Sequence, residues 1–166
     1  PNNKLIIWDD HKKNVLGELP IYNKEAKEPS DDSSLIAEEL MNKIAYEITH
    51  SKDQISSISI VGSKKGVGKT EISEKLFYKL TSLGKRVCLL DLDYKKRDLT
   101  LKSFSSEKTP KDFKEFFQDI DSYKIEQSLF IPSFDVENSV EVFTSDEFAS
   151  EIKKLKEEYD YVICDT

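Results

Sequence analysis

The sequence predicts an α/β fold in which helices flank a parallel sheet, and three stretches support this prediction. Residues 58–83 combine an apolar strand, a glycine-rich loop and an amphipathic helix. Residues 86–91 and 159–165 are apolar runs typical of buried parallel strands, and each ends in an aspartate. Helical patterns separate these runs, so right-handed crossovers are expected between the strands. The 166 residues suffice for one domain with a substantial core.

The first residues are expected to lie outside the regular α/β core. Residues 1–33 are interpreted as an N-terminal segment and linker, and residues 34–166 as the domain itself. Within the segment, residues 5–8 fit a short strand or an apolar anchor. Residues 14–22 form an apolar stretch broken by glycine and proline, and residues 24–32 are polar like a linker.

A helix is predicted over residues 34–50, because apolar residues recur along one of its faces. This helix either packs against the domain or faces a partner, and the sequence leaves both interpretations open. The apolar face comprises Leu35, Ile36, Leu40, Ile44, Ala45 and Ile48.

The stretch 58–83 begins with a short strand, which alternating serine and isoleucine residues predict to be largely buried. Gly66 and Gly68 then supply the backbone freedom that a tight loop needs. A helix is predicted from Lys69, and Gly84 stands where its C-terminal cap belongs. The predicted apolar face of this helix consists of Ile72, Leu76, Phe77, Leu80 and Leu83.

A strand, a glycine-rich loop and a helix in this order form the setting of a phosphate-binding loop. Amide groups at the start of the helix and the helix dipole attract an anion. Lys69 would reach the β- and γ-phosphates of a nucleotide, and the Thr70 hydroxyl would bind Mg²⁺. The alternative is a turn that binds nothing, but the flanking elements favour nucleotide binding. Residues 64–70 resemble the deviant phosphate loop of the Min/Par partition ATPases, with Lys65 the only mismatch.

Acidic residues end two of the predicted strands. Asp91 and Asp93 close the strand that follows the loop and its helix, at the sheet edge where ligands gather in open α/β folds. Two such carboxylates can serve Mg²⁺ or accept a proton. Asp165 ends the last apolar run as in a Walker B strand, whose carboxylate holds the water shell of Mg²⁺. The basic residues 95–97 fit a solvated loop, or a contact to phosphate or to a neighbouring subunit.

The remaining elements are predicted from local signals. A helix is expected to open at Pro110, with the aromatic side chains of its apolar face in the core. Residues 129–131 fit a strand stopped by proline, and residues 140–143 fit a short strand or an extended loop. Thr144 and Glu147 form a capping-box pair before the last helix. The apolar residues predicted for these two helices are Phe113, Phe116, Phe117 and Ile120, then Phe148, Ile152 and Leu155.

Composition and charge narrow the class of protein. A net charge of −7 and a pI near 5.0 disfavour nucleic acid as a partner. Cys88 and Cys164 lie in apolar runs and are interpreted as core residues in a reducing compartment, with a disulfide as the minor alternative. The two histidines lie far apart, so a zinc site has no support. No 18-residue apolar stretch is present. The ends suggest a piece of a longer protein, truncated after the Walker B strand.

Three motifs taken together resemble the cytoplasmic domain of bacterial tyrosine kinases, which belong with the chain-length regulators of capsule and exopolysaccharide synthesis. They are residues 61–70, 84–93 and 159–166. Weaker similarities, in family order, are Leu-Gly-Glu-Leu-Pro at 16–20, the helix start at 34–38, and residues 143–148. The resemblance therefore extends over most of the chain, from about Val15.

The resemblance implies an ATP- and Mg²⁺-dependent tyrosine kinase at the inner face of the bacterial inner membrane. Its partner would be a membrane-spanning polysaccharide co-polymerase region in the same or another chain, and self-association is expected. Lys69, Asp91 and Asp93 would be catalytic, and Thr70, Asp91 and Asp165 would hold the metal. The implied nucleotide-binding residues are Lys64, Lys65, Gly66, Val67, Gly68, Lys69, Thr70 and Glu71.

Two alternatives stay open beside the kinase. The domain could respond to nucleotide with little phosphotransfer, since Lys95 stands where the family has arginine and the helix over 34–50 lacks two expected arginines. It could instead be a Min/Par-type partition ATPase, for which Lys64 is typical.

Overall fold

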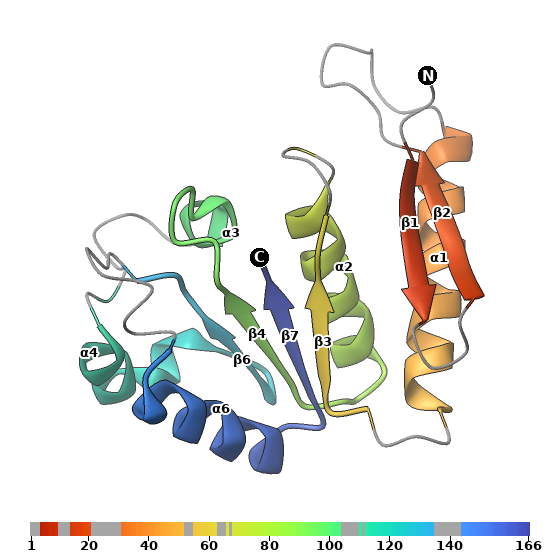
Figure 1. Cartoon of the computed structure of the whole chain (residues 1–166). Coiled ribbons are helices and arrows are strands. Elements are labelled where there is room, and N and C mark those ends of the chain that lie inside the picture. The colour runs from red at the N-terminus through yellow and green to blue at the C-terminus, as the bar shows by residue number, and fades with distance from the viewer. Residues whose placement is uncertain are drawn as a thin grey trace.

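The computed structural model describes residues 4–9, 14–20, 31–51, 55–62, 66, 68–103, 110, 112–134 and 144–166. Its main sheet has five strands in the order β3-β7-β4-β6-β5 (Figure 1). The first four strands are parallel, and β5 pairs antiparallel with β6 at one edge. The predicted α/β class is confirmed. These strands are β3 (Ser57–Ile60), β4 (Val87–Asp91), β5 (Lys124–Ile125), β6 (Ser128–Ile131) and β7 (Tyr161–Asp165).

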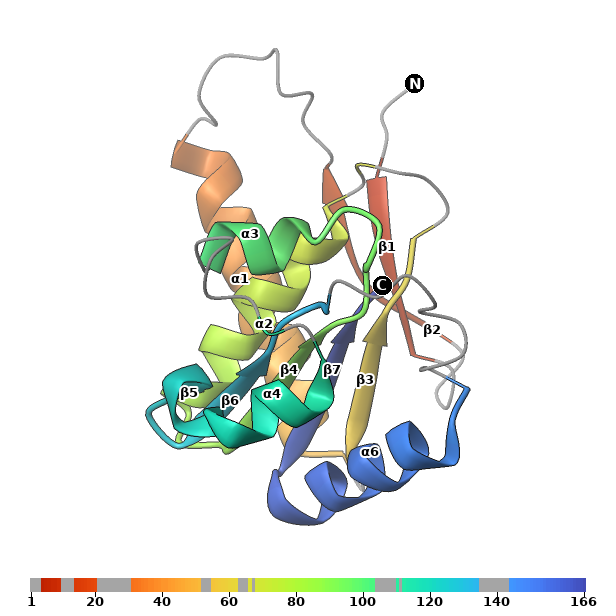
Figure 2. The same cartoon turned by 90° about the vertical axis from the view of Figure 1, so that its left-hand side faces the viewer.

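Helices cover both faces of this sheet (Figure 2). α1 (Asp31–Thr49), α2 (Lys69–Ser82) and α3 (Asp98–Ser103) belong to one face, where Leu99 of α3 joins the core cluster. α4 (Phe113–Gln118), the 3₁₀ helix η2 (Ile120–Tyr123) and α6 (Asp146–Glu158) belong to the other. The sheet is therefore the middle one of three layers.

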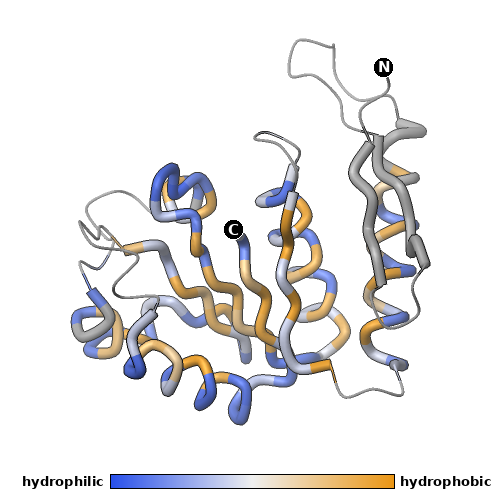
Figure 3. Tube along the Cα trace, viewed as in Figure 1, coloured by the Kyte–Doolittle hydropathy of each residue, from blue (hydrophilic) through white to orange (hydrophobic). Residues whose placement is uncertain are grey.

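Successive side chains of strand β4 alternate between two hydrophobic clusters, one on each face of the sheet. Val87 and Leu89 join the cluster under α1 and α2, whereas Cys88 and Leu90 join the cluster under α4 and α6. All five β4 residues are buried, as expected of a parallel strand covered on both faces. Hydrophobic residues accordingly concentrate along the central strands in Figure 3.

The phosphate-loop helix follows its predicted pattern except at the end. Ile72, Leu76, Phe77 and Leu80 are buried, but Leu83 is 49% exposed. Leu83 caps the helix, and Gly84 follows with a φ of 75°. The Gly84 and Lys85 amides donate to the carbonyls of Thr81 and Leu80, which is a Schellman ending. This turn directs Leu83 away from the core.

The N-terminal segment contains more regular structure than the sequence indicated. Strands β1 (Lys4–Asp9) and β2 (Asn14–Pro20) form a separate antiparallel sheet that lies alongside α1 in Figure 1. Helix α1 begins at Asp31, three residues before the predicted start. Its residues Leu40, Met41, Ile44 and Ala45 are buried in the cluster shared with α2, as expected of a packing helix, whereas Leu35 of the predicted apolar face is 58% exposed.

Four other local predictions were wrong. Strand β3 is only half buried, because it is the last strand at its edge of the sheet. The helix expected at Pro110 starts at Phe113, since the Asp112 carboxylate caps it by accepting from the Glu115 amide. Phe117 on that helix is 38% exposed, while Phe116 is buried. Ser145, not Thr144, caps α6 by accepting from the Phe148 amide.

The structure also bears on the predictions for the two cysteines and for membrane spans, whereas two predicted segments fall on residues that it does not describe. Cys88 and Cys164 are both free thiols, and burial raises the pKa of each. Residues 24–30 and 140–143 lie outside the described part of the chain. In the part that is described, no helix has the length and apolar character needed to cross a bilayer.

Candidate functional site

The predicted site residues meet at the carboxyl ends of three adjacent strands. In the register of β4 and β7, Asp91 lies beside Asp165. The Leu92 amide donates to the Asp165 carbonyl, and the Thr166 hydroxyl donates to the Ile60 carbonyl, so all three strand ends are joined. Helix α2 also begins at this edge of the sheet (Figure 1). The fold thus brings together residues that are up to 106 positions apart in the sequence.

The glycines of the predicted phosphate loop have the backbone geometry that glycine favours. Gly66 and Gly68 have φ values of 75° and 89°, in the left-handed region. An added Cβ would meet no atom within 4 Å at either position, so backbone conformation rather than crowding calls for glycine. Gly68 precedes α2, whose N-terminus has no side-chain cap. Lys64, Lys65 and Val67 lie outside the described residues.

Asp165 is a buried carboxylate with one uncommitted oxygen. It is 1% exposed, and its Oδ1 accepts a 2.9 Å hydrogen bond from the Ser73 hydroxyl of α2. Among the residues that the structure describes, none forms a hydrogen bond with its buried Oδ2. Burial raises the pKa of Asp165, whereas the Thr70 and Ser73 hydroxyls and the Lys69 ammonium oppose that rise. Such a carboxylate favours a nearby cation.

Asp91 is buried to a similar degree but accepts more hydrogen bonds than Asp165. Its Oδ2 accepts from both the amide and the hydroxyl of Thr100, at 2.9 and 2.6 Å. Its Oδ1 accepts from the Asp93 amide at 3.1 Å. Burial nevertheless raises the pKa of Asp91, and the charge of Asp165 adds to this rise. Asp93 is partly exposed, and its Oδ1 accepts from the Lys96 amide at 3.3 Å.

Three residues of this site were not predicted from the sequence. Ser73 is completely buried between α2 and Asp165, and a serine on the apolar side of a helix was the available signal. Thr100 and Ser133 are also buried, and the Ser133 amide donates to the Thr100 hydroxyl at 2.8 Å. Neither of these two has a motif around it, and the short helix α3 that carries Thr100 was itself not predicted.

Two other predicted contacts involve exposed side chains. Glu71 forms a 2.7 Å ion pair with Lys75 one turn along α2, and its side chain is 63% exposed. A contact of Glu71 with nucleotide would therefore come from its backbone amide. The Lys95 ammonium lies 5.8 Å from the centre of the Tyr94 ring, and Lys95 is exposed as expected of a solvated loop.

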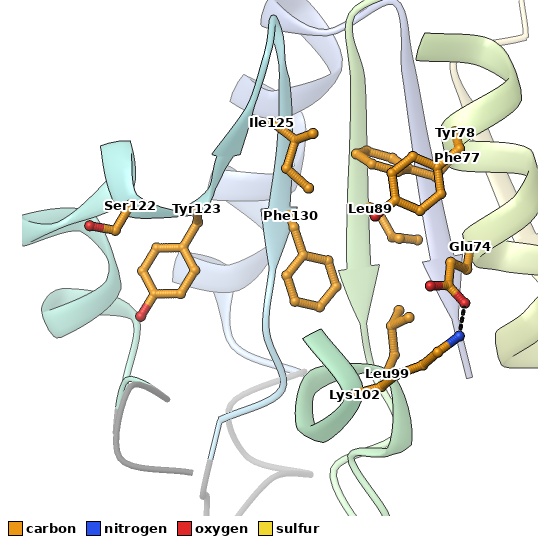
Figure 4. A pocket seen from close by; sticks show the side chains of 10 residues that line it. All are labelled: Glu74, Phe77, Tyr78, Leu89, Leu99, Lys102, Ser122, Tyr123, Ile125 and Phe130. Carbon is orange, nitrogen blue, oxygen red and sulfur yellow. Dashed lines mark hydrogen bonds and ion pairs between the residues drawn. The ribbon is translucent and has the colours of Figure 1, made fainter. Parts of the chain in front are cut away.

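A cavity of about 280 Å³ lies on the α2 side of the sheet, apart from these acids (Figure 4). Phe77, Leu89, Leu99 and Phe130 supply its apolar lining, and none of the three aspartates contributes to it. At its border, Lys102 of α3 pairs with Glu74 of α2. The cavity therefore does not mark the predicted phosphate site.

The arrangement at the strand ends suits Mg²⁺ that is held partly by phosphate. Among the residues described, no group of three or more His, Cys, Asp or Glu side chains is placed to hold a metal ion alone. Mg²⁺ in phosphate-transfer sites takes only one or two carboxylates, with water and phosphate oxygens completing its shell. Asp165, with its free buried oxygen, and the Thr70 hydroxyl fit that requirement.

Comparisons with known proteins agree with this fold. A family model described as an AAA domain matches residues 55–166. The BceF tyrosine kinase domain is similar with a TM-score of 0.57 and 20% identity, over 84% of this chain and 57% of that one. The kinase domain of the Escherichia coli tyrosine kinase ETK gives 0.61 and 17%, over 83% of this chain and 56% of that one.

A third similar structure has a different activity. It is cobyrinic acid a,c-diamide synthase from Mycobacterium smegmatis with a bound ATP analog and magnesium. Its TM-score is 0.52 at 22% identity, over 67% of this chain and 50% of that one. None of the curated proteins compared with the chain matches it. At these identities the likeness to solved structures is one of fold, and the chain spans little more than half the length of the BceF and ETK domains.

Proposed function

We propose, since this chain belongs to the AAA domain family, that it binds Mg²⁺–ATP at residues 64–71 and transfers the γ-phosphate to tyrosine. The observation that carries the proposal is Oδ2 of Asp165, which is buried without a hydrogen-bond partner among the described residues and interacts with Thr70 and Lys69 at the start of α2. A carboxylate buried in this way is costly unless a cation balances it. The Lys69 ammonium and Mg²⁺ together would balance both this carboxylate and the nucleotide phosphates.

The residues of the loop and helix would bind the nucleotide. The amides around Gly66 and Gly68 and the Lys69 ammonium would hold the β- and γ-phosphates. Thr70 and Asp165 would hold Mg²⁺, which supplies neutralisation of the charge that develops on the phosphate oxygens. Ser73 would keep Asp165 oriented toward this position through its 2.9 Å hydrogen bond.

The carboxylates at the end of β4 would assist the transfer. A tyrosine hydroxyl attacks the γ-phosphorus while its proton passes to Asp93 or Asp91. The bond from the γ-phosphorus to the bridging oxygen breaks, and ADP leaves with that oxygen. Such a reaction depends on positioning and charge neutralisation rather than on covalent intermediates.

The biological setting is part of the proposal and rests on sequence resemblance. The matches at residues 16–20 and 34–38 favour a chain-length regulator of capsule or exopolysaccharide synthesis. The chain would then act at the inner face of the bacterial inner membrane, beside a membrane-spanning co-polymerase region, and would self-associate. Residues 34–166 would form the nucleotide-binding domain, with residues 1–33 leading into it.

Incubation with Mg²⁺ and [γ-³²P]ATP tests the activity. We expect label on tyrosine, and we expect Lys69→Met to lower it at least about 100-fold, because a charge that stabilises the transferring phosphoryl group is lost. Lys79→Met, at the opposite end of the same helix, is the matched control and should retain labelling.

The other outcomes separate the alternatives. Tight ATP binding without label would favour a nucleotide-responsive regulator, and release of phosphate without label would favour a partition-type ATPase. Absence of ATP binding by calorimetry would overturn all three.

A further inference from the structure

The Asp91 carboxylate has four lone-pair positions, and three of them are occupied. Thr100 fills both positions of Oδ2, with its amide at 2.9 Å and its hydroxyl at 2.6 Å. The Asp93 amide fills one position of Oδ1. Among the described residues, the position that is left belongs to Oδ1. Oδ1 is therefore the oxygen of Asp91 that can accept a further hydrogen bond.

The direction of the Thr100 hydroxyl is itself determined. The Ser133 amide donates to Thr100 Oγ1 at 2.8 Å. The one hydrogen of the Thr100 hydroxyl points to Asp91 at 2.6 Å, because an ionised carboxylate only accepts hydrogen bonds. All three residues are buried, with exposures of 3% for Asp91, 0% for Thr100 and 2% for Ser133. Water is thus kept away from hydrogen bonds that join β4, α3 and the segment after β6.

Helix α3 is held from its other side as well. Lys102, two residues after Thr100, pairs with Glu74 of α2 across the border of the cavity (Figure 4). Leu99, immediately before Thr100, is 1% exposed and packs in the core cluster that includes Phe77 and Phe130. Thr100 thus stands on a short helix that is anchored to the phosphate-loop helix and to the sheet.

From this geometry we propose that Thr100 is a positioning residue, which occupies Oδ2 of Asp91 and leaves Oδ1 as the atom that meets the substrate complex. The inference rests on the proposed function and deepens it, because it assigns separate tasks to the two acids of residues 91–93. Asp91 is held in one orientation by Thr100. Asp93, which is partly exposed and accepts a long 3.3 Å bond from the Lys96 amide through Oδ1, is the less firmly held of the two acids.

The test compares Thr100→Val with Thr100→Ser in the full chain. Valine keeps the size of threonine but removes the hydroxyl, so Asp91 loses one of two bonds to Oδ2. We expect kcat for tyrosine labelling to fall about 10- to 100-fold while KM for ATP stays within about 3-fold, because misplacement affects the transition state. Serine keeps the hydroxyl and should restore kcat to within about 3-fold of the wild type.

A matched control separates this effect from general damage. Thr81→Val makes the same change at another buried threonine, whose hydroxyl bonds to Ser128 at 3.0 Å at the opposite end of α2. It should lower stability without changing kcat. A crystal structure of Thr100→Val without nucleotide gives a readout independent of activity, and should show the Asp91 side chain in more than one orientation.

The outcomes for Thr100 and for the proposed function are distinct. A normal kcat in Thr100→Val with Asp91 in its original orientation would overturn the assignment alone. A fall in kcat that serine does not restore would also overturn it, since the loss would then come from packing. A wild-type chain that binds no Mg²⁺–ATP would overturn the proposed function, and the assignment with it.

Discussion

Asp91 and Asp165 are neighbours in the register of two parallel strands, yet their surroundings differ sharply. Both side chains are almost fully buried, at 3% and 1% exposure. Asp91 accepts three hydrogen bonds, two of them from Thr100. Asp165 has one oxygen bonded to Ser73, and the other has no partner in the described part of the chain. Burial raises the pKa of both carboxyl groups, so burial alone does not distinguish them.

Of the two acids, only Asp91 receives its hydrogen bonds from the fold itself. A buried carboxylate with three donors is already part of the structure, and removing its oxygens leaves donors without acceptors. A buried carboxylate with a free oxygen destabilises the folded chain in the absence of nucleotide, and a bound cation offsets this destabilisation. Functional sites are where such uncompensated groups are expected. The two acids should consequently respond in opposite ways to the same substitution.

The largest effect is expected for Asp91→Asn. An asparagine has one acceptor oxygen, so its amide group would face a donor of Thr100 or Asp93. We expect the free energy of unfolding to fall by about 2 to 3 kcal/mol, the cost of leaving a buried donor unsatisfied. Urea denaturation measures it. Asp121→Asn is the control, because that side chain is 85% exposed and its ion pair with Lys124 lies in solvent, where such pairs contribute little to stability. A loss no larger than that of the control would show that the Thr100 bonds contribute little.

The second effect is smaller and opposite in sign. Asp165→Asn keeps an acceptor for Ser73 and removes the buried charge. We expect the chain without nucleotide to gain about 1 kcal/mol in the free energy of unfolding, as at other sites where function opposes stability. The same variant should lose most of its affinity for Mg²⁺–ATP in calorimetry. A variant that is destabilised, or that binds nucleotide normally, would place the cation elsewhere.

The sequence correctly predicted that Asp91 and Asp165 lie at the same edge of the sheet. The apolar runs before Asp91 and Asp165 are long enough to be buried strands, and parallel strands bring their carboxyl ends to one edge. The glycine loop and the apolar face from Ile72 placed α2 beside that edge. These features depend on local patterns of apolar and glycine residues, which can be recognised in the sequence without knowledge of the tertiary contacts.

The partners of the two acids could not be predicted in this way. Helix α3 has six residues, too few for a periodic apolar pattern, so Thr100 gave no signal. Ser133 contacts Thr100 only because β6 lies next to β4 in the sheet. The local sequence of neither segment predicts this strand order. The half-buried state of β3 likewise follows from its place at the edge. At α6, two adjacent hydroxyl residues could serve as the cap, and it is the Ser145 side chain that accepts from the Phe148 amide.

The smallest effect is a change in the pH dependence of stability. Because the pKa of Asp165 in the folded chain is raised above its ordinary value of 3.8, the folded state binds this proton more tightly than the unfolded state. Its contribution to stability is complete below pH 3.8 and is lost as the pH rises through the folded pKa. The advantage of Asp165→Asn over wild type should therefore be near zero at pH 3 and grow toward neutral pH.

Asp160, which precedes β7 at its other end, should show the opposite pH dependence of stability in the same measurement. The hydrogen bond from the Arg86 guanidinium lowers the pKa of Asp160, so its contribution is present above pH 3.8 and is lost as the pH falls through the folded pKa. Asp160→Asn should destabilise the chain at neutral pH, and this effect should vanish in acid. Denaturation of the three proteins from pH 3 to 7 at low salt compares the two slopes. An advantage of Asp165→Asn that stays constant across this range would mean that its source is packing rather than the buried charge.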